Sequence, residues 1–400
     1  MLTKRTLVIF FIALIAFEIS SGFSRTTFDS FVELAYAWLH GHLWLAHPSQ
    51  GIAFNDVVYR GRSYVIEGPM SAVQLLPVVA VFGLHANQTM VCVLDAAIAV
   101  AAMDVALARM SVAPAIRNWA LALLAFGSAL WYCAALGSVW VFGSVAGTMF
   151  VALALAELFG RRRYWLVGLL VACAGLSRAP MLLGAVPIVT WGVVGQPAAA
   201  RGRALGSLLA GFVPLYAAYA AYNVARWGTP FDLGYVLFAR QFDMGYVTYA
   251  HLDPATAQPV GFPFGLRFLP YNLYTTFLLP PDISKAFPWI RPTAYGVALT
   301  FTAPALALAF AARWGKETIA CWIAALAAAA PTMFYYMNGW TQLGVRHSLD
   351  YEVFLIPLVA RGLTRFPKPA AFALVGYSIA ANAYLMAYAW AFATTSGIPI

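Results

Sequence analysis

Apolar stretches long enough to form membrane-spanning helices recur along almost the whole chain. A helix needs about 20 mostly apolar residues to cross the hydrocarbon core of a bilayer. The candidate stretches are 6–22, 88–108, 118–136, 140–159, 164–178, 180–196, 205–226, 293–312, 318–337, 351–363 and 370–393. The pattern therefore predicts an all-α bundle of about 11 transmembrane helices in a single membrane domain, residues 1–400.

The pair 164–178 and 180–196 is short and meets at Ser177-Arg178-Ala179-Pro180. Proline cannot continue a helix through its own N–H, but it is well suited to the first turn of a new one. We therefore expect one helix to end near Arg178 and the next to begin at Pro180.

The apolar segment 70–84 is short and carries Pro77 in its middle. Its two alternatives are a twelfth span and a helix that lies in the membrane interface. If it lies in the interface and the N-terminus is cytoplasmic, the basic turns between helices all face the cytoplasm, as the positive-inside rule requires, whereas a twelfth span would move most of them outside. These turns contain Arg109, Arg117, Arg161, Arg162, Arg163, Arg201, Arg203, Arg313, Lys316, Arg361, Arg365 and Lys368. We therefore predict an interfacial helix. This topology leaves two large segments outside, 23–87 and 227–292, and a shorter one at 338–350.

Composition agrees with a membrane protein and argues against a soluble domain, a nucleic-acid-binding protein and a disulfide- or zinc-stabilised fold. The chain is 62% hydrophobic and only 10% charged, whereas soluble domains carry roughly 25% charged residues. The formal charge of +9 comes largely from the cytoplasmic turns, so it is an orientation signal and predicts no nucleic-acid partner. The cysteines are scattered through apolar segments and form no disulfide framework or zinc pattern; they are Cys92, Cys133, Cys173 and Cys321.

The first outer segment begins with an amphipathic pattern over 28–45. The apolar residues that recur at helical spacing are Phe28, Phe31, Ala35, Trp38 and Leu39. The other face carries Asp29, Glu33, Tyr36 and His40. This spacing predicts a helix on the membrane surface, with its polar face toward water or a cleft.

Two short β-branched and aromatic runs follow the amphipathic pattern. Val57-Val58-Tyr59 and Tyr64-Val65-Ile66 flank Arg60-Gly61-Arg62. Two such runs around a glycine-containing turn predict a small β-hairpin.

Short motifs along most of the chain form a recognisable set. An acidic residue opens the amphipathic helix in Thr27-Phe28-Asp29, and Asp56, Gly61, Tyr64, Pro69 and Pro77 follow. The later motifs are Gly175-Leu176-Ser177-Arg178-Ala179-Pro180, Tyr222-Asn223, Arg226-Trp227-Gly228-Thr229-Pro230, Arg267-Phe268-Leu269-Pro270-Tyr271-Asn272-Leu273 and Gly344-Val345-Arg346-His347. With these motifs the chain resembles the GT-C superfamily of membrane glycosyltransferases. It is most similar to the bacterial branch related to protein mannosyltransferases and lipid A aminoarabinose transferases.

The resemblance implies a GT-C-like fold in the bacterial inner membrane with its active site on the outer face. It also implies a polyprenyl-phosphate sugar donor and an acceptor hydroxyl on a glycan, lipid or protein, with inversion at the anomeric carbon. A carboxylate must take the acceptor's proton, and the resemblance assigns this role to Asp29. The alternative role for Asp29 is to cap the helix that follows it.

Many members of this superfamily carry two adjacent acids at this point, whereas here Ser30 follows Asp29. A second acid would have to be Glu33, Asp56 or Glu67. Some relatives use a divalent metal near these acids. Asp29 and Asp56 would offer it two oxygens, and because hard cations take six or more, we predict no obligatory metal.

A fixed cation is needed to stabilise the departing lipid phosphate. Arg178 is the first candidate, because a charge between two apolar segments is costly and is usually paired or functional. The further candidates are Arg346, His347, Arg226 and Arg267. The alternative for each arginine is snorkelling to headgroups or pairing with an outer acid.

The aromatic-rich segment 227–292 is expected to cover the substrates. Its candidate substrate-loop residues are Tyr271 and Asn272, and Tyr64 is the candidate in the first outer segment. The alternative is an aromatic belt that anchors the protein at the interface.

Two other functions stay open. A secondary transporter or lipid flippase would use the intramembrane acids Glu18, Asp95 and Asp104 as coupling residues, although the chain lacks the repeated halves common in transporters. An O-antigen ligase or polymerase-like enzyme would use Arg346-His347.

Overall fold

The computed structural model describes residues 3–46, 56–242, 262–339 and 342–396, and helices dominate this part of the chain. The helices of the N-terminal half are α1 (Lys4–Ser20), α2 (Ser30–Leu39), α3 (Met70–Phe82), α4 (Gln88–Arg109), α5 (Pro114–Phe126), α6 (Leu130–Leu136), α7 (Val139–Leu158), α8 (Tyr164–Ser177) and α9 (Ala179–Val194). Those of the C-terminal half are α10 (Ala198–Trp227), α11 (Gly234–Phe242), α13 (Leu269–Phe277), α14 (Leu299–Thr302), α15 (Lys316–Met333), α16 (Leu349–Leu363) and α17 (Lys368–Ser396). Short 3₁₀ helices add η2 (Gly83–His85), η4 (Leu266–Phe268), η5 (Pro304–Ala311) and η6 (Arg346–Ser348).

Among the described residues, four helices are long and apolar enough to cross a membrane on their own: α4, α7, α10 and α17. The pair α5 and α6 would make a fifth span if its two helices, bent by 45°, cross together. The shorter apolar helices α3, α8 and α9 have 13 to 16 residues. The chain is therefore mostly helical with several potential membrane spans.

The predicted single helix over 293–312 is wrong. This stretch contains the four-residue α14 and the 3₁₀ helix η5, separated by Ala303. Ala303 has φ −142° and ψ 49°, outside the helical region. Pro304 follows it, and a proline disfavours helical geometry in the residue before it and lacks an N–H to continue a helix. The prediction was based on hydrophobicity alone and did not take the effect of Pro304 into account.

The predicted interruption at Ser177–Pro180 is confirmed. α8 ends at Ser177, Arg178 is extended with φ −154° and ψ 112°, and α9 begins at Ala179. Pro180 lies in the first turn of α9, where its missing N–H costs nothing.

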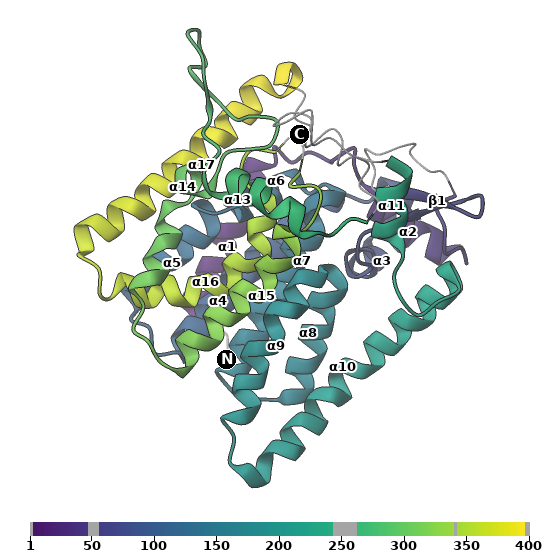
Figure 1. The fold of residues 1–400 in the computed structure, drawn as a ribbon, viewed down its shortest axis with the longest axis horizontal. Coiled ribbons are helices and arrows are strands. Elements are labelled where there is room, and N and C mark those ends of the chain that lie inside the picture. The colour runs from purple at the N-terminus through teal and green to yellow at the C-terminus, as the bar shows by residue number, and fades with distance from the viewer. Residues whose placement is uncertain (1–2, 47–55, 243–261, 340–341, 397–400) are drawn as a thin grey trace.

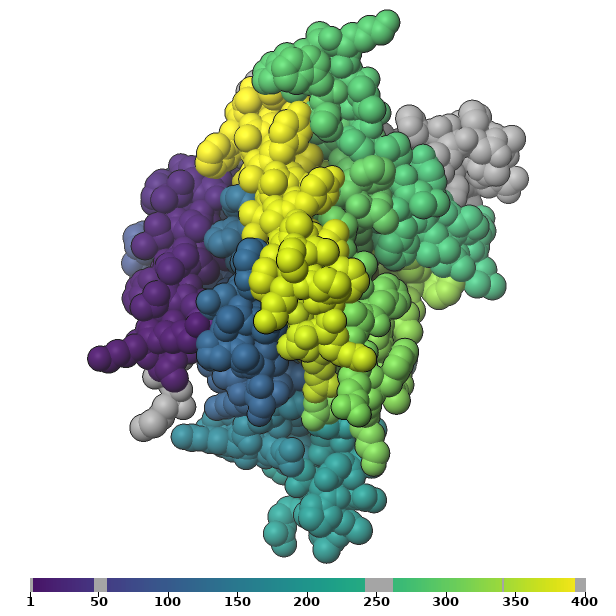
Figure 2. Space-filling view, turned by 90° about the vertical axis from the view of Figure 1, so that its left-hand side faces the viewer, coloured from purple at the N-terminus to yellow at the C-terminus, as the bar shows by residue number. Residues whose placement is uncertain are grey.

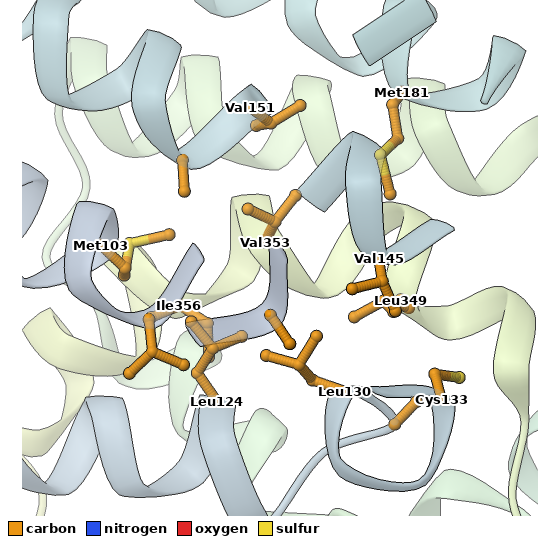
Figure 3. Packing of buried hydrophobic residues seen from close by; sticks show 14 of the residues in the cluster. Met103, Leu124, Leu130, Cys133, Val145, Val151, Met181, Leu349, Val353 and Ile356 are labelled. Atoms are coloured by element: carbon orange, nitrogen blue, oxygen red, sulfur yellow. The ribbon is translucent and has the colours of Figure 1, made fainter. Parts of the chain in front are cut away.

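The centre of the bundle is α16. Every residue of α16 except Arg361 is buried. Figure 3 shows Leu349, Val353 and Ile356 of this helix among side chains from the surrounding helices. These neighbours are Met103 of α4, Leu124 of α5, Leu130 and Cys133 of α6, Val145 and Val151 of α7, and Met181 of α9. The surrounding helices therefore cover α16 on all sides, including its acidic residues Asp350 and Glu352.

The predicted β-hairpin is confirmed. β1 (Asp56–Tyr59) pairs antiparallel with β2 (Arg62–Val65), with Val57 opposite Tyr64. Arg60 and Gly61 form the two-residue turn and have positive φ values of 51° and 75°. Two positive φ values define the type I′ turn, whose twist matches that of the strands. A second hairpin joins β3 (Asp282–Ile283) to β4 (Ile290–Arg291).

The predicted helix over 28–45 is shorter and more enclosed than its pattern indicated. It extends over Ser30–Leu39 as α2 and packs against α3. Phe31 is fully buried and meets the ring of Phe142 in α7. Leu34 and Ala37, outside the predicted apolar stripe, are buried as well, so protein rather than lipid covers much of this helix.

Figure 1 shows α10 and α17 running in the same direction, from lower left to upper right. The N-terminus lies on the lower-left side, whereas α2, α11 and β1 lie at the upper right. In the space-filling view of Figure 2, α17 forms an exposed yellow ridge along the bundle. Elements from the predicted outer segments 23–87 and 227–292 therefore meet here, since α11 contacts β1 and α2 contacts β2, whereas α13 lies nearer the middle of the picture.

Glycines set how closely α8 and α10 approach. A Cβ added at Gly211 would lie 1.8 Å from the Trp165 carbonyl oxygen, and one at Gly168 would lie 2.0 Å from that of Leu208. Gly206, also on α10, has open space at the same position. Small residues at helix contacts allow such close backbone approach in membranes.

We therefore expect opposite effects from two alanine substitutions on α10. Gly211→Ala should destabilise the protein by about 1–3 kcal/mol, because the added methyl overpacks a tight contact. Gly206→Ala should be neutral or stabilising by up to about 1 kcal/mol, because alanine favours the helix. Thermal unfolding of both variants in the same detergent measures this difference, and equal midpoints would contradict the packing described.

Candidate functional site

A cluster of charged and polar side chains surrounds Arg178 in the gap between α8 and α9. Its Nε lies 3.3 Å from both carboxylate oxygens of Asp350, and its Nη1 donates to Oε2 of Glu67 at 3.3 Å. All three side chains are buried. A buried guanidinium needs such partners, because an unpaired charge in a low-dielectric interior is very costly.

The close approach of Glu67 to Arg178 depends on the residue that follows it. A Cβ added at Gly68 would lie 2.2 Å from the carbonyl oxygen of Leu176, near the end of α8. Only a glycine lets the chain pass this close to the helix end. The sequence Glu67-Gly68-Pro69 thus brings the end of the first outer segment onto the α8–α9 gap.

Asp350 reaches the cluster from the first turn of α16. Its Oδ1 also accepts a hydrogen bond from Ser144 of α7 at 2.9 Å. Arg178 and Ser144 together bond this buried carboxylate, and they tie α7, α16 and the α8–α9 gap to one another.

His347 adds a neutral imidazole. Its Nδ1 lies 2.6 Å from Nη2 of Arg178. Because arginine has only donors, Nδ1 must accept and the ring proton must be on Nε2. Burial, followed by the charges of Arg178 and Arg346, lowers the pKa of His347 well below its ordinary value, which agrees with a neutral ring.

Tyr235 of α11 completes the cluster from the second outer segment. Its hydroxyl donates to Oε2 of Glu67 at 2.6 Å and lies 3.4 Å from Nη1 of Arg178. Burial, and then the charge of Glu67, raises the pKa of Tyr235 well above its ordinary value. The phenol therefore stays protonated and serves as a donor.

Arg346 lies next to this cluster but is bound differently. Its side chain is half-buried, and its Nε is buried without a hydrogen-bond partner in the described part of the chain. Within the same residues it makes no ion pair. Burial first, with Arg178 contributing, lowers the pKa of Arg346 from its ordinary value. A bound anion would accept a hydrogen bond from the Arg346 Nε and would raise the pKa of Arg346 again.

Among the described residues, none of the other predicted acids forms a hydrogen bond or ion pair with Arg178. Asp29 forms an ion pair with Arg25, one turn before it, and accepts no N-cap hydrogen bond although it occupies the N-cap position of α2. Glu33 is half-buried one turn further along α2. Asp56 is buried at the start of β1. Of the four predicted acids, Glu67 is the one that pairs with a predicted phosphate-binding cation, Arg178, among the described residues.

Arg226 has a structural position. Its Nη1 donates to the carbonyl of Val65 at 3.3 Å, its Nη2 donates to Asn223 at 2.7 Å, and Asp232 lies 3.7 Å away. It thereby fixes β2 to the end of α10. Arg267 is exposed and lies over the ring of Phe268.

The predicted substrate-loop residues also pack into the fold. Tyr64 meets the ring of Trp227 at 4.9 Å, and Asn272 donates to the carbonyls of Met333 and Tyr335. Tyr271 is buried beside Tyr295. These contacts hold the outer segments together, while Tyr335 reaches the ring of Tyr235 in the Arg178 cluster.

Two of the three acids predicted to lie inside the membrane are bonded to other side chains. Asp104 of α4 accepts from Arg5, Thr6 and Arg117, and Asp95 of the same helix accepts from Gln74 of α3 at 2.8 Å. In the described residues no group of three or more His, Cys, Asp or Glu side chains is arranged to hold a metal ion.

Comparisons with protein-family models, with curated proteins and with solved structures found no match to this chain. The contacts of the chain's own residues therefore carry the functional argument.

Sequence reasoning named Arg178, Glu67, Arg346 and His347 but not Asp350, Tyr235 or Ser144 as site residues. The position of Asp350, three residues after His347 at the start of an apolar helix, was the one available signal. Tyr235 and Ser144 gave none, because an isolated tyrosine or serine is common in such segments.

We expect Arg178→Met to destabilise the protein by about 3–5 kcal/mol, because it leaves Glu67 and Asp350 as uncompensated buried charges. Adding Glu67→Gln and Asp350→Asn to this variant should recover much of the loss, since the buried charges are then removed. Unfolding measurements in detergent compare the three proteins. An Arg178→Met variant as stable as wild type would contradict the ion-pair geometry.

Asp56 should make the stability of the protein depend on pH. Its Oδ1 is buried without a hydrogen-bond partner among the described residues, and burial raises its pKa from 3.8 to about 6. Between these values the folded state binds more protons than the unfolded state, so stability should fall as the pH rises toward about 6 and then stay low. Asp56→Asn should remove this decrease and be more stable than wild type above that pH. Unfolding curves across this pH range that are parallel for the two proteins would disprove the assignment.

Proposed function

We propose that the protein is an integral membrane glycosyltransferase that transfers a sugar from a polyprenyl-phosphate donor to an acceptor hydroxyl at the outer face of the membrane. The supporting observation is the convergence of all three predicted outer segments on Arg178. Glu67 comes from 23–87, Tyr235 from 227–292, and His347 with Asp350 from 338–350.

The proposal includes a GT-C-like bundle of membrane helices, with the N-terminus in the cytoplasm of a bacterial cell. Helices too short to cross a bilayer alone, such as α8 and α9, would cross it only partly and leave Arg178 in a recess below the outer surface. A polyprenyl chain would lie against the exposed apolar surface of the helices, and its phosphate would enter this recess.

Arg346 is the proposed contact for the donor phosphate. Arg178 already faces two carboxylates and the His347 nitrogen, so little of its charge is left for a ligand. Arg346 makes no ion pair with a described residue, and its buried Nε has no hydrogen-bond partner among them. Arginine binds phosphate oxygens through two parallel hydrogen bonds, and these strengthen as charge develops on the leaving group.

Asp29 is the proposed general base and Glu67 the second acid. Glu67 accepts from both Arg178 and Tyr235, which suits a residue that fixes the cation rather than one that takes up a proton. Asp29 is buried and pairs with Arg25, whose side chain is exposed beside it, so the acceptor would have to enter along this arginine. In an inverting displacement this carboxylate would remove the acceptor proton while the sugar–phosphate bond breaks on the opposite side of the anomeric carbon.

The transporter alternative has less support. Asp104 is bonded to two arginines and a threonine, which is the arrangement of a structural ion pair. A proton pathway would have to use Asp95, which accepts a hydrogen bond from Gln74, or the half-buried Glu18.

Single-turnover sugar transfer tests the proposal. Purified wild type and Asp29→Asn are given a panel of radiolabelled polyprenyl-phosphate sugars with a native membrane extract as acceptor. We expect transfer by wild type and a loss of about 100-fold or more in Asp29→Asn, the usual contribution of a general base.

Asp282→Asn is the matched control, because Asp282 is an exposed carboxylate on the hairpin formed by β3 and β4 and belongs to no cluster described above. It should transfer sugar at the wild-type rate. If Asp29→Asn is as active as Asp282→Asn, the base is another residue. If wild type transfers no sugar from any donor but moves a solute into liposomes, the glycosyltransferase proposal is wrong.

A further inference from the structure

A shallow pocket of about 560 Å³ lies far from the Arg178 cluster. It is lined by Arg313, Trp314, Gly315, Arg361, Thr364 and Arg365. Asp350 is in the first turn of α16 and Arg361 in its last. They are eleven positions apart, which corresponds to about 16 Å along the helix, so the two sites are separate.

The pocket is strongly positive. Of its three arginines, Arg361 is held by an ion pair with Glu317 of α15. Arg313 and Arg365 are exposed and make no ion pair with the described residues. Because guanidinium groups stay charged in proteins and have only donors, the pocket favours an anion with several acceptor oxygens.

The backbone adds to this preference. Gly315 lines the pocket and immediately precedes α15, a helix of 18 residues without a side-chain N-cap bond. The first N–H groups of a helix lack intrahelical partners, and the helix dipole makes this end positive. The arginines and the start of α15 therefore both favour binding of an anion.

The surroundings of the pocket are apolar and open. Trp314 is 73% exposed and Phe310, just before it, is 77% exposed. Large aromatic side chains beside basic residues are typical of the boundary between the lipid tails and the headgroups. The anion that fits this position therefore carries acyl chains.

We propose that this pocket binds the phosphate of an anionic phospholipid headgroup, with Arg313 and Arg365 as its main contacts and the acyl chains against Trp314 and Phe310. The proposal does not depend on the glycosyltransferase activity. The pocket arginines belong to the predicted cytoplasmic turns, so the proposed lipid site lies at the cytoplasmic surface.

Native mass spectrometry of the detergent-purified protein tests this, with short-chain phosphatidylglycerol as the probe. The double variant Arg313→Gln/Arg365→Gln leaves the Arg361–Glu317 ion pair intact and should fold normally. Each basic residue at an anionic lipid contributes about fivefold in affinity, so this variant should bind about 30-fold more weakly.

The matched control is Arg161→Gln/Arg203→Gln, which removes two exposed arginines from other cytoplasmic turns and should bind as wild type does. Two further probes identify the ligand class. Short-chain phosphatidylcholine tests the need for net negative charge, and glycerol 3-phosphate tests the need for acyl chains. Weak binding of both supports the proposal.

Equal binding of phosphatidylcholine would overturn the anionic specificity. Binding of glycerol 3-phosphate as tight as that of phosphatidylglycerol would assign the pocket to soluble phosphate esters instead. If the pocket variant and the control bind phosphatidylglycerol equally, the pocket is not the site.

Discussion

The burial of Arg178 is the constraint on which the rest of this structure depends. A guanidinium between two apolar helices is stable only if carboxylates and acceptors are brought to it, because the interior cannot solvate it. Its carboxylate partners are 111 and 172 residues away in the sequence, at Glu67 and Asp350. Formation of the α8–α9 gap is thereby coupled to the docking of the first outer segment and to the position of α16. The central helix and the outer segments cannot be placed independently of each other.

This constraint also shapes what the site can do. Because Arg178 is matched by two acids, it serves as a fixed centre that orients Glu67, Tyr235 and His347 rather than as a free charge. The neighbouring Arg346 makes no ion pair with a described residue. A rigid, paired cation beside an unpaired one is a suitable arrangement for an anionic leaving group, since the unpaired arginine gains most when negative charge arrives. This difference between the two arginines supports our proposal of a lipid-phosphate donor, which the sequence resemblance implies.

Local sequence signals predicted local structure well. Arg60-Gly61 between two β-branched runs gave the hairpin, and Pro180 gave the break between α8 and α9, because each depends on backbone preferences of a few residues. The sequence failed at 293–312, where an apolar run concealed the effect of Pro304. It could identify Arg178 as an unusual residue but not Asp350 or Tyr235 as its partners, since such pairs are set by tertiary packing. The role of Asp29 as a base stays a prediction.

Binding of a polyprenyl monophosphate is the measurement that tests the central claim most directly. Wild type, Arg346→Gln and Arg240→Gln would be compared by titration in the same detergent, the last as a control because Arg240 is exposed on α11 and makes no ion pair with the described residues. Loss of a charge-assisted hydrogen bond to a buried phosphate should weaken binding by Arg346→Gln about 10- to 100-fold, with Arg240→Gln unchanged. Equal affinity of all three proteins would contradict the assignment of the Arg178–Arg346 region as the phosphate site.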